Sequence, residues 1–188
     1  MKEPQTNLTV MLERAAAGDA AANDDLFQHI YPTLKKLAHS QLSRHQRGTL
    51  CTTELVHEVS LKLFGAEHLG NVENRSHLMA TAARAMRHIL VDHARKRGSK
   101  KRGGEWTRIE LDASELSADR LSEQVLALEG ALKHLHDVDE RCHQVVELKF
   151  FGGFTIPEIA DFLDVSEGTV KLAWRKARAF LYAEIDST

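Results

Sequence analysis

The stretch TIPEIADFLDVSEGTVKLAWRKARAFLY, residues 155–182, decides how the C-terminal part of the chain folds. Thr155 and Glu158 have the spacing of a capping box, which marks the start of a helix. Pro157 lies in the first turn of that helix, where its missing N–H removes no hydrogen bond. Ser166 follows about two turns later and is a favoured capping residue for a second helix. Two short helices in close succession are therefore predicted here.

The second of these helices has one apolar face and one basic face. Lys171, Arg175 and Arg178 fall on the side opposite the apolar residues, which are spaced i, i+4, i+7 and i+11: Val170, Trp174, Ala177 and Leu181. Two helices joined by a tight turn, the second with a basic outer stripe, are typical of a helix-turn-helix. Such cations can reach phosphates and guanine edges in the major groove. The alternative is a helical hairpin whose cations are merely solvated.

The rest of the chain has the same helical character. It contains only three prolines, and its apolar residues recur every three to four positions. We predict an all-α fold. The expected N-terminal helices are one over 8–17, one over 23–45 interrupted near Pro32, one that follows Thr52 and Thr53 and stops at Gly65, and one over 76–97.

Charge is distributed unevenly along the 188 residues. Residues 1–104 carry 16 Lys and Arg against 10 Asp and Glu, whereas residues 105–188 carry 9 against 17. Residues 84–102 alone hold eight cations and one acid, which favours binding to a polyanion. Glycines among cations, followed by acids, indicate a flexible linker over 98–121. We therefore expect two small helical domains, at 1–97 and 122–188.

Other function classes are disfavoured by composition. Cys51 and Cys142 are far apart, which favours a reducing cytoplasm over a disulfide scaffold. His57-Glu58 lacks the second histidine of a zinc-protease motif, and no glycine-rich phosphate loop or nucleophile elbow stands out. We expect no secretory signal, membrane span, metal or cofactor, and no catalysis. The protein is thus expected to be cytoplasmic and not an enzyme.

Two stretches of the chain resemble extracytoplasmic-function (ECF) sigma factors. Residues 139–182 resemble the family's promoter −35-reading domain. Residues 53–97 resemble its second region, which binds core RNA polymerase and the −10 element, with ELVHE at 54–58 and VDHARKR at 91–97 as landmarks. The resemblance covers most of the chain. It implies an alternative sigma factor that directs promoter-specific transcription initiation, with the β′ clamp helices and β flap of core polymerase and promoter DNA as partners.

The resemblance also assigns roles to residues. Those implied to contact the −35 element are Ser166, Thr169, Lys171, Arg175 and Arg178. Those implied to hold the melted −10 strand are Arg84, Arg87, His88, Arg95, Lys96 and Arg97. Those implied to dock on core polymerase are Glu54, His57, Glu58 and Lys62. For each set the alternative is that its members are ordinary solvated residues on the surface of a helix.

Departures from the family pattern are also informative. An aromatic residue is frequent near Thr81 and is absent here, and the frequent Ser-Arg pair of the recognition helix is Leu172-Ala173. The docking helix usually opens with Asp-Ala-Glu-Asp, whereas residues 51–54 read Cys-Thr-Thr-Glu. A phosphate on Thr53, or on Thr52, would restore negative charge at a helix N-terminus. We hypothesise that a serine/threonine kinase activates the protein in this way; the alternative is that a threonine only caps the helix.

A second function remains open at this stage. The chain could be a regulator with a C-terminal helix-turn-helix and an N-terminal helical sensing or dimerisation domain that never joins polymerase. A metal-dependent enzyme is a third and weaker alternative, which predicts stoichiometric metal in the purified protein. Retention by core polymerase separates the first two.

Overall fold

The structure is a computed structural model that describes residues 5–44, 50–64, 72–102 and 113–186. Every regular element in these ranges is helical, so the predicted all-α fold is confirmed. None of the described helices is both long and apolar enough to cross a membrane. The elements in chain order are α1 (Gln5–Ala16), α2 (Ala20–Arg44), α3 (Thr52–Leu63), α4 (Arg75–Arg102), α5 (Ala113–Val138), α6 (Glu140–Val146), the π-helical turn η2 (Glu147–Phe151), α7 (Ile156–Leu163) and α8 (Glu167–Asp186).

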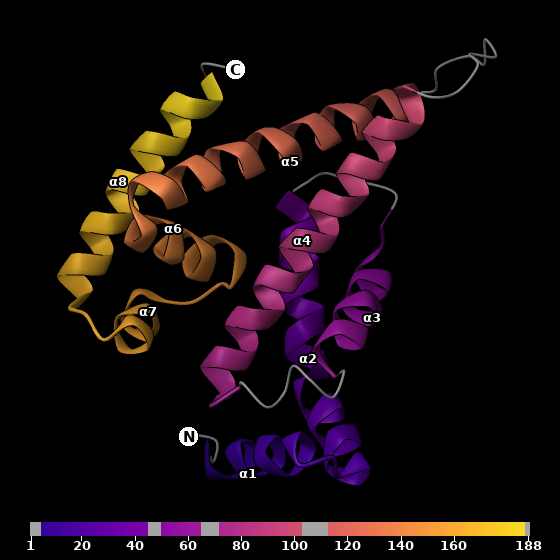
Figure 1. Ribbon diagram of the computed structural model, residues 1–188, viewed down its shortest axis with the longest axis vertical. Helices are drawn as coiled ribbons and strands as arrows, with labels where there is room; N and C mark the ends of the chain where they lie inside the picture. Colours follow the sequence, from indigo (N-terminus) through magenta and orange to yellow (C-terminus); the bar gives the residue numbers. More distant parts are fainter. Residues whose placement is uncertain (1–4, 45–49, 65–71, 103–112, 187–188) are drawn as a thin grey trace.

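Helices α1 to α4 form the first half of the molecule, in which α2, α3 and α4 pack together (Figure 1). The chain turns from α1 into α2 at Gly18, whose φ of 90° is readily adopted only by glycine. Asp19 then caps α2, because its Oδ1 accepts a hydrogen bond from the Ala22 N–H at 3.2 Å. The largest fully buried side chains of this half are Leu12, Leu26, Ile30, Leu34, Leu55, Leu78, Met86 and Ile89.

The predicted interruption near Pro32 is wrong. Helix α2 runs unbroken from Ala20 to Arg44 with Pro32 inside it. A proline at such a position costs about 3 kcal/mol, since it removes one backbone hydrogen bond and crowds the preceding turn. Ile30 and Leu34, on either side of it, are fully buried. Burial of such side chains contributes about 1.5–3 kcal/mol each, which offsets the cost and keeps the helix continuous.

Helices α5 to α8 form the second half. The Asp139 carboxylate caps α6 by accepting a hydrogen bond from the Cys142 N–H at 3.0 Å. Helix α6 then widens into η2, where the Gly152 N–H reaches back five residues to the Glu147 carbonyl at 2.9 Å. Widened turns of this kind are rare and often lie at functional positions. The turn leads into α7 through Gly152 and Gly153.

Helices α7 and α8 form the predicted helix-turn-helix. The capping box is present, since the Thr155 N–H donates to Glu158 Oε2 at 2.8 Å. Helix α7 ends at Asp164, which has a φ of 51°, and the Ser166 hydroxyl then accepts a hydrogen bond from the Thr169 N–H at 3.1 Å. Ile159 of α7 and Val170 and Ala177 of α8 are fully buried in the core, whereas Trp174 and Leu181 are half-buried and pack against it.

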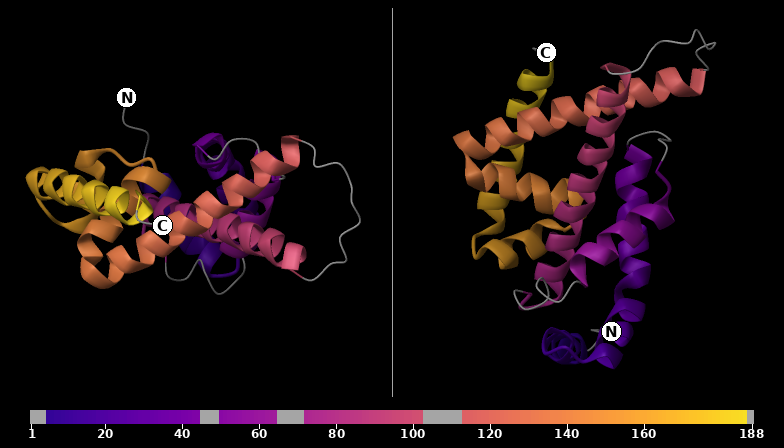
Figure 2. Two further views of the ribbon diagram at one scale, coloured as in Figure 1. Left: turned by 90° about the horizontal axis from the view of Figure 1, so that it is seen from above. Right: turned by 45° about the vertical axis from the view of Figure 1, so that its right-hand side comes forward.

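The two halves are in contact along α4 and α5 (Figure 2). Helix α4 extends to Arg102 and α5 begins at Ala113, so both helices enter the range where we predicted a linker. Residues 103–112 of that predicted linker lie outside the described residues. One buried apolar cluster runs through both halves, from Leu8 in α1 to Ala177 in α8. The domain boundaries at 97 and 122 stay a prediction.

Gly152 should not tolerate a side chain. A Cβ at this position would lie 2.7 Å from the Leu148 carbonyl oxygen and 2.7 Å from the Phe154 ring, so the backbone must shift. We expect Gly152→Ala to lower the free energy of unfolding by about 1–3 kcal/mol. Gly130→Ala is the matched control, because no atom lies within 4 Å of its Cβ and alanine favours the helix by about 1 kcal/mol. Urea unfolding of both variants checks whether the free energy of unfolding falls in Gly152→Ala and rises in Gly130→Ala.

Candidate nucleic-acid interface

The exposed face of α8 carries the three predicted cations. Lys171, Arg175 and Arg178 are all exposed, on the side opposite the buried Val170 and Ala177. Lys171 Nζ lies 3.1 Å from Glu167 Oε2, and the Arg178 guanidinium stacks 5.7 Å from the centroid of the Tyr182 ring. Both contacts are on the surface and are weak in water, so these cations can exchange them for phosphates.

Ser166 and Thr169 lie together at the N-terminus of α8. Their hydroxyl groups are 2.9 Å apart, and Ser166 is exposed while Thr169 is half-buried. Because the Ser166 hydroxyl also accepts the Thr169 N–H, both side chains already serve to start the helix. Their predicted contact with DNA remains a prediction.

The basic residues of α4 do not form one surface. Arg95 and Lys96 are exposed, Arg97 is half-buried, and Arg95 lies 3.9 Å from Asp92. Arg84 and Arg87 instead face the C-terminal half of the molecule. His88 is exposed on the same helix, beside Arg87. The helix therefore carries an exposed basic group near its C-terminal end. Nearer its middle Arg87 is buried, whereas Arg84 and His88 remain exposed.

Arg87 is the most buried of the residues predicted to hold the −10 strand, and that role stays a prediction. We predicted that it contacts DNA, but only 8% of it is exposed. Its Nε lies 2.8 Å from Glu147 Oε1, and its guanidinium also pairs with the Glu129 carboxylate and lies over the Phe151 ring. A cation surrounded by carboxylates and an aromatic ring in the interior cannot contact a nucleic acid in this arrangement. Sequence periodicity missed this because the partners come from α5 and η2, more than 40 residues away.

Glu147 is the acid at the centre of this cluster. It is 2% exposed, and its second oxygen, Oε2, lies 3.5 Å from Arg84 Nε. Burial raises the pKa of Glu147, and the charges of Arg87 and Arg84 oppose that rise. The sequence analysis singled out neither Glu147 nor Glu129. An acid on the apolar face of a helix does not reveal which distant residue it will pair with.

His143 should make stability depend on pH. Burial, with the charges of Arg87, His136 and Arg84, lowers the pKa of His143 from 6.5 to about 4, although Glu147 Oε1 lies 3.9 Å from His143 Nε2. Between pH 6.5 and 4 the unfolded chain binds a proton that the folded one does not. The contribution of His143 to the free energy of unfolding is therefore fully present above pH 6.5. It falls by about 1–3 kcal/mol as the pH drops to 4. Denaturation at several pH values measures how the free energy of unfolding changes with pH. This dependence should be shallower for His143→Gln than for His134→Gln, a control at an exposed position.

Helix α3 presents the predicted docking residues at its surface. Glu54, His57 and Lys62 are exposed, opposite a buried stripe of Leu55, Val56, Val59 and Leu63. Glu58 is half-exposed and lies 3.1 Å from His93 of α4. Glu54 Oε2 accepts the Cys51 N–H at 2.7 Å, and this hydrogen bond lowers the pKa of Glu54. Three of the four residues thus stay available for a partner, and Glu58 joins α3 to the basic helix.

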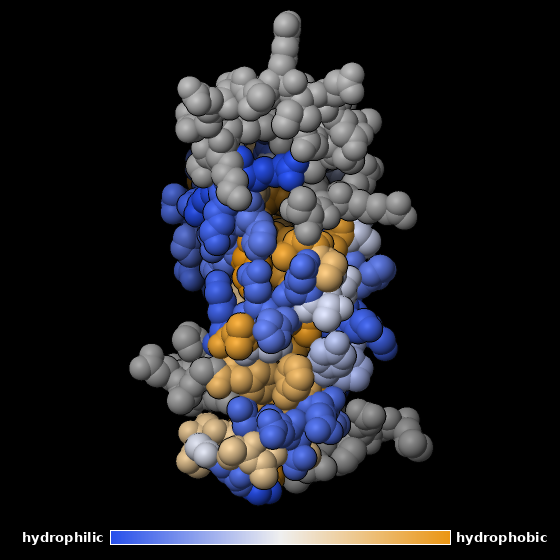
Figure 3. Space-filling model, turned by 90° about the vertical axis from the view of Figure 1, so that its right-hand side faces the viewer, coloured by the Kyte–Doolittle hydropathy of each residue, from blue (hydrophilic) through white to orange (hydrophobic). Residues whose placement is uncertain are grey.

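Leu61 was missed by the sequence reasoning. It lies on α3 with 67% of its surface exposed, and it falls outside the buried stripe. An apolar residue off the core stripe is the signal that would have found it. Figure 3 views the side of the molecule that carries α3, where hydrophobic residues are visible among hydrophilic ones.

The remaining predictions concern metal binding and the stacking of bases on an aromatic residue. Within the described ranges, no group of three His, Cys, Asp or Glu side chains could hold a metal ion. The α4 segment that lacks an aromatic residue, Met79 to Ala83, is mostly buried, and the Thr81 hydroxyl donates to the His77 carbonyl at 2.9 Å. That segment serves the core of the N-terminal half.

The chain is all-helical, with a basic stripe on α8 of the helix-turn-helix and a second basic helix, α4. These features are typical of DNA-binding transcription proteins. Residues 5–187 match the family model of ECF sigma factors, and the chain belongs to this family. The resemblance seen in the sequence is therefore confirmed, and the protein is an alternative sigma factor that acts in transcription initiation. A comparison with curated proteins found no match. The family's role is regulatory: its members bring core RNA polymerase to promoter DNA.

Proposed function

We propose a division of this role among the helices. Helix α3 docks on the β′ clamp helices of core polymerase, the basic helix α4 holds the melted −10 strand, and α8 reads the −35 element. The observation that supports it best is the outward basic stripe of α8 on a capped helix-turn-helix. Each surface alone is small, so tight promoter binding requires polymerase to fix their spacing and raise their effective concentration.

We further propose that docking is switched on by phosphorylation at the start of α3. Cys51 occupies the cap position with extended backbone, and Glu54 is the acid of the first turn. The Glu54 carboxylate is already used by the Cys51 N–H. Glu54 keeps its negative charge, but it is the one acid in the first turn of α3, so this end of the docking helix presents less negative charge to β′ than the acidic quartet usual in the family. A phosphate would add a charge of about −1.5 to −2 and is favoured by the helix dipole.

Exposure favours Thr53 over Thr52 as the acceptor. Thr53 is exposed, whereas Thr52 is half-buried. A kinase needs to reach the hydroxyl group, and a phosphate on Thr53 stays in water until the partner arrives. The partner implied is a serine/threonine protein kinase. This refines the hypothesis drawn from the sequence, in which both threonines were candidates.

Affinity for core polymerase tests the switch. Kinase-treated protein should bind about tenfold more tightly or better than untreated protein, since one charge-assisted hydrogen bond is worth about 1.5–3 kcal/mol. Thr53→Ala should abolish the response, Thr53→Glu should reproduce part of it, and Thr52→Ala should leave it intact. Equal binding by all forms, including the matching Thr52 variants, contradicts the switch but leaves the sigma-factor role in place.

A further inference from the structure

The C-terminal half covers one face of the basic helix α4. Gln41 of α2 joins the halves, since its Nε2 donates to the Ala83 carbonyl in α4 at 3.3 Å and to the Phe151 carbonyl in η2 at 3.1 Å. Helices α6 and α7 and the turn η2 lie beside α4 in Figure 1, and η2 contacts it directly. The rings of His77 and Phe162 meet edge to face at 6.4 Å near the start of α4.

The charges at this junction are matched. The two oxygens of Glu147 each face one arginine, with Oε1 at 2.8 Å from Arg87 Nε and Oε2 at 3.5 Å from Arg84 Nε. Glu129 of α5 supplies a second carboxylate to Arg87. A carboxylate presents two acceptor oxygens to a guanidinium group much as a phosphate does. The C-terminal half thus places anions on two arginines that the family resemblance assigns to DNA.

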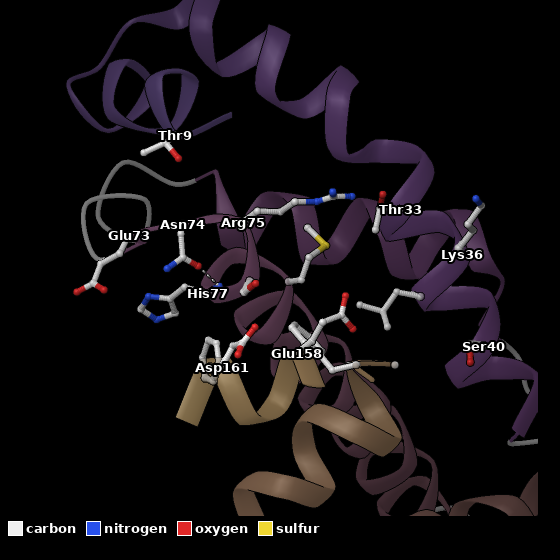
Figure 4. Close-up of a pocket in the computed structure, with 17 residues that line it drawn as sticks. Thr9, Thr33, Lys36, Ser40, Glu73, Asn74, Arg75, His77, Glu158 and Asp161 are labelled. Carbon is white, nitrogen blue, oxygen red and sulfur yellow. Dashed lines mark hydrogen bonds between the residues drawn. The ribbon is translucent and has the colours of Figure 1, made fainter. Parts of the chain in front are cut away.

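The same complementarity continues beyond the cluster. A cavity of ≈ 980 Å³ separates the start of α4 and part of α2 from α7. Figure 4 shows Lys36 and Arg75, together with the acid Glu73, on the N-terminal side of this cavity, and Glu158 and Asp161 on α7 across from them. Opposite charges therefore face each other over space that is not filled by side chains.

These features describe a junction that can open. Close packing is absent over the cavity, and a buried ion cluster contributes little net stability because desolvation cancels most of the attraction. Removal of one partner is costly, however, since it leaves the other charge buried and unpaired. The junction therefore favours these particular pairs of carboxylates and arginines. Water or DNA can replace the carboxylates on the arginines at a modest cost in free energy.

We propose that this arrangement is a closed, autoinhibited state, in which the Glu147 and Glu129 carboxylates occupy the places of DNA phosphates on Arg84 and Arg87. The inference rests on the proposed role of α4 in holding the −10 strand. Closure and strand binding compete, because closure encloses the Arg87 guanidinium and also uses Nε of Arg84, whose side chain is 49% exposed. The free protein consequently binds single-stranded DNA weakly, and the halves separate when DNA displaces Glu147.

The test uses the full-length chain and a short fluorescent single-stranded DNA. Glu147→Gln keeps the shape of the side chain and removes its charge. It should bind the DNA about tenfold more tightly or better than wild type, since apparent affinity rises with the open fraction. Glu140→Gln makes the same change in net charge at an exposed position of α6 and should differ from wild type by less than about twofold. Hydrogen exchange in η2 should quicken in Glu147→Gln and not in the control.

Two further variants separate this proposal from the proposed function. Gln41→Ala loosens the junction with no change of charge and should also tighten DNA binding, which covers the case that Glu147→Gln fails to fold. Adding Arg84→Ala to Glu147→Gln should remove the gain. If exchange in η2 is unchanged while binding still depends on Arg84, the closed state is overturned and the role of α4 stands. If η2 opens but neither Glu147→Gln nor Arg84→Ala affects binding, the role of these arginines in DNA binding is overturned, and the inhibitory closure with it.

Discussion

Replacement of Lys171, Arg175 and Arg178 together by alanine should abolish promoter-directed transcription by the polymerase complex. The three side chains form the exposed basic stripe of α8. Each contact of this kind is worth about 1–3 kcal/mol, so the loss of three should lower promoter affinity about 100-fold or more. The slope of log affinity against log salt should also fall by about 0.9 for each phosphate contact that is lost. Run-off transcription and binding titrations at several salt concentrations measure both effects.

The control for this prediction changes a cation elsewhere. Arg141 is exposed on α6, and Arg141→Ala removes one charge without touching α8. It should leave both the affinity and the salt slope close to wild type. Affinity for core polymerase should be retained by the triple variant, because α3 is unaltered. A triple variant with normal promoter binding would show that the basic stripe is only a solvated surface.

Ile159→Ala should be the most destabilising single change in the helix-turn-helix. Ile159 is 0% exposed and packs α7 against the rest of the C-terminal half. Truncation of a buried isoleucine to alanine costs about 2–5 kcal/mol, because it loses apolar burial and leaves a cavity. Ile156→Ala is the matched control, since Ile156 is half-buried on the same helix and should cost much less. Urea unfolding measures the difference; equal losses would mean that α7 is not held by this contact.

Local signals in the sequence predicted the helix-turn-helix well. The capping box of Thr155 and Glu158 and the cap at Ser166 depend on residues three positions apart, so the sequence alone reveals them. The same holds for the buried stripe of α3. The predicted interruption at Pro32 was wrong, because the burial of Ile30 and Leu34 outweighs the cost of the proline, and burial is a tertiary property.

The pairing of α4 with the C-terminal half could not be predicted in this way. Arg87 looks like an exposed cation when only the helical period is considered, and nothing in that period reveals the contact of the exposed Arg84 with Glu147. Their partners Glu129 and Glu147 lie more than 40 residues from Arg87, and Glu147 is positioned by a π-helical turn for which the sequence gives no marker. Arg87 was assigned to DNA from the family resemblance, which gives no sign that Glu129, Glu147 and the Phe151 ring surround its side chain.

The central claim is that the chain guides core RNA polymerase to a promoter, and run-off transcription tests it most directly. Purified core enzyme, this protein and a template carrying a cognate promoter should yield a transcript of defined length. The account predicts that the yield rises when the protein has been phosphorylated on Thr53 and vanishes when the basic stripe of α8 is replaced. Absence of binding to core enzyme and of any transcript, with untreated and kinase-treated protein alike, would contradict the claim and leave a helical DNA-binding regulator.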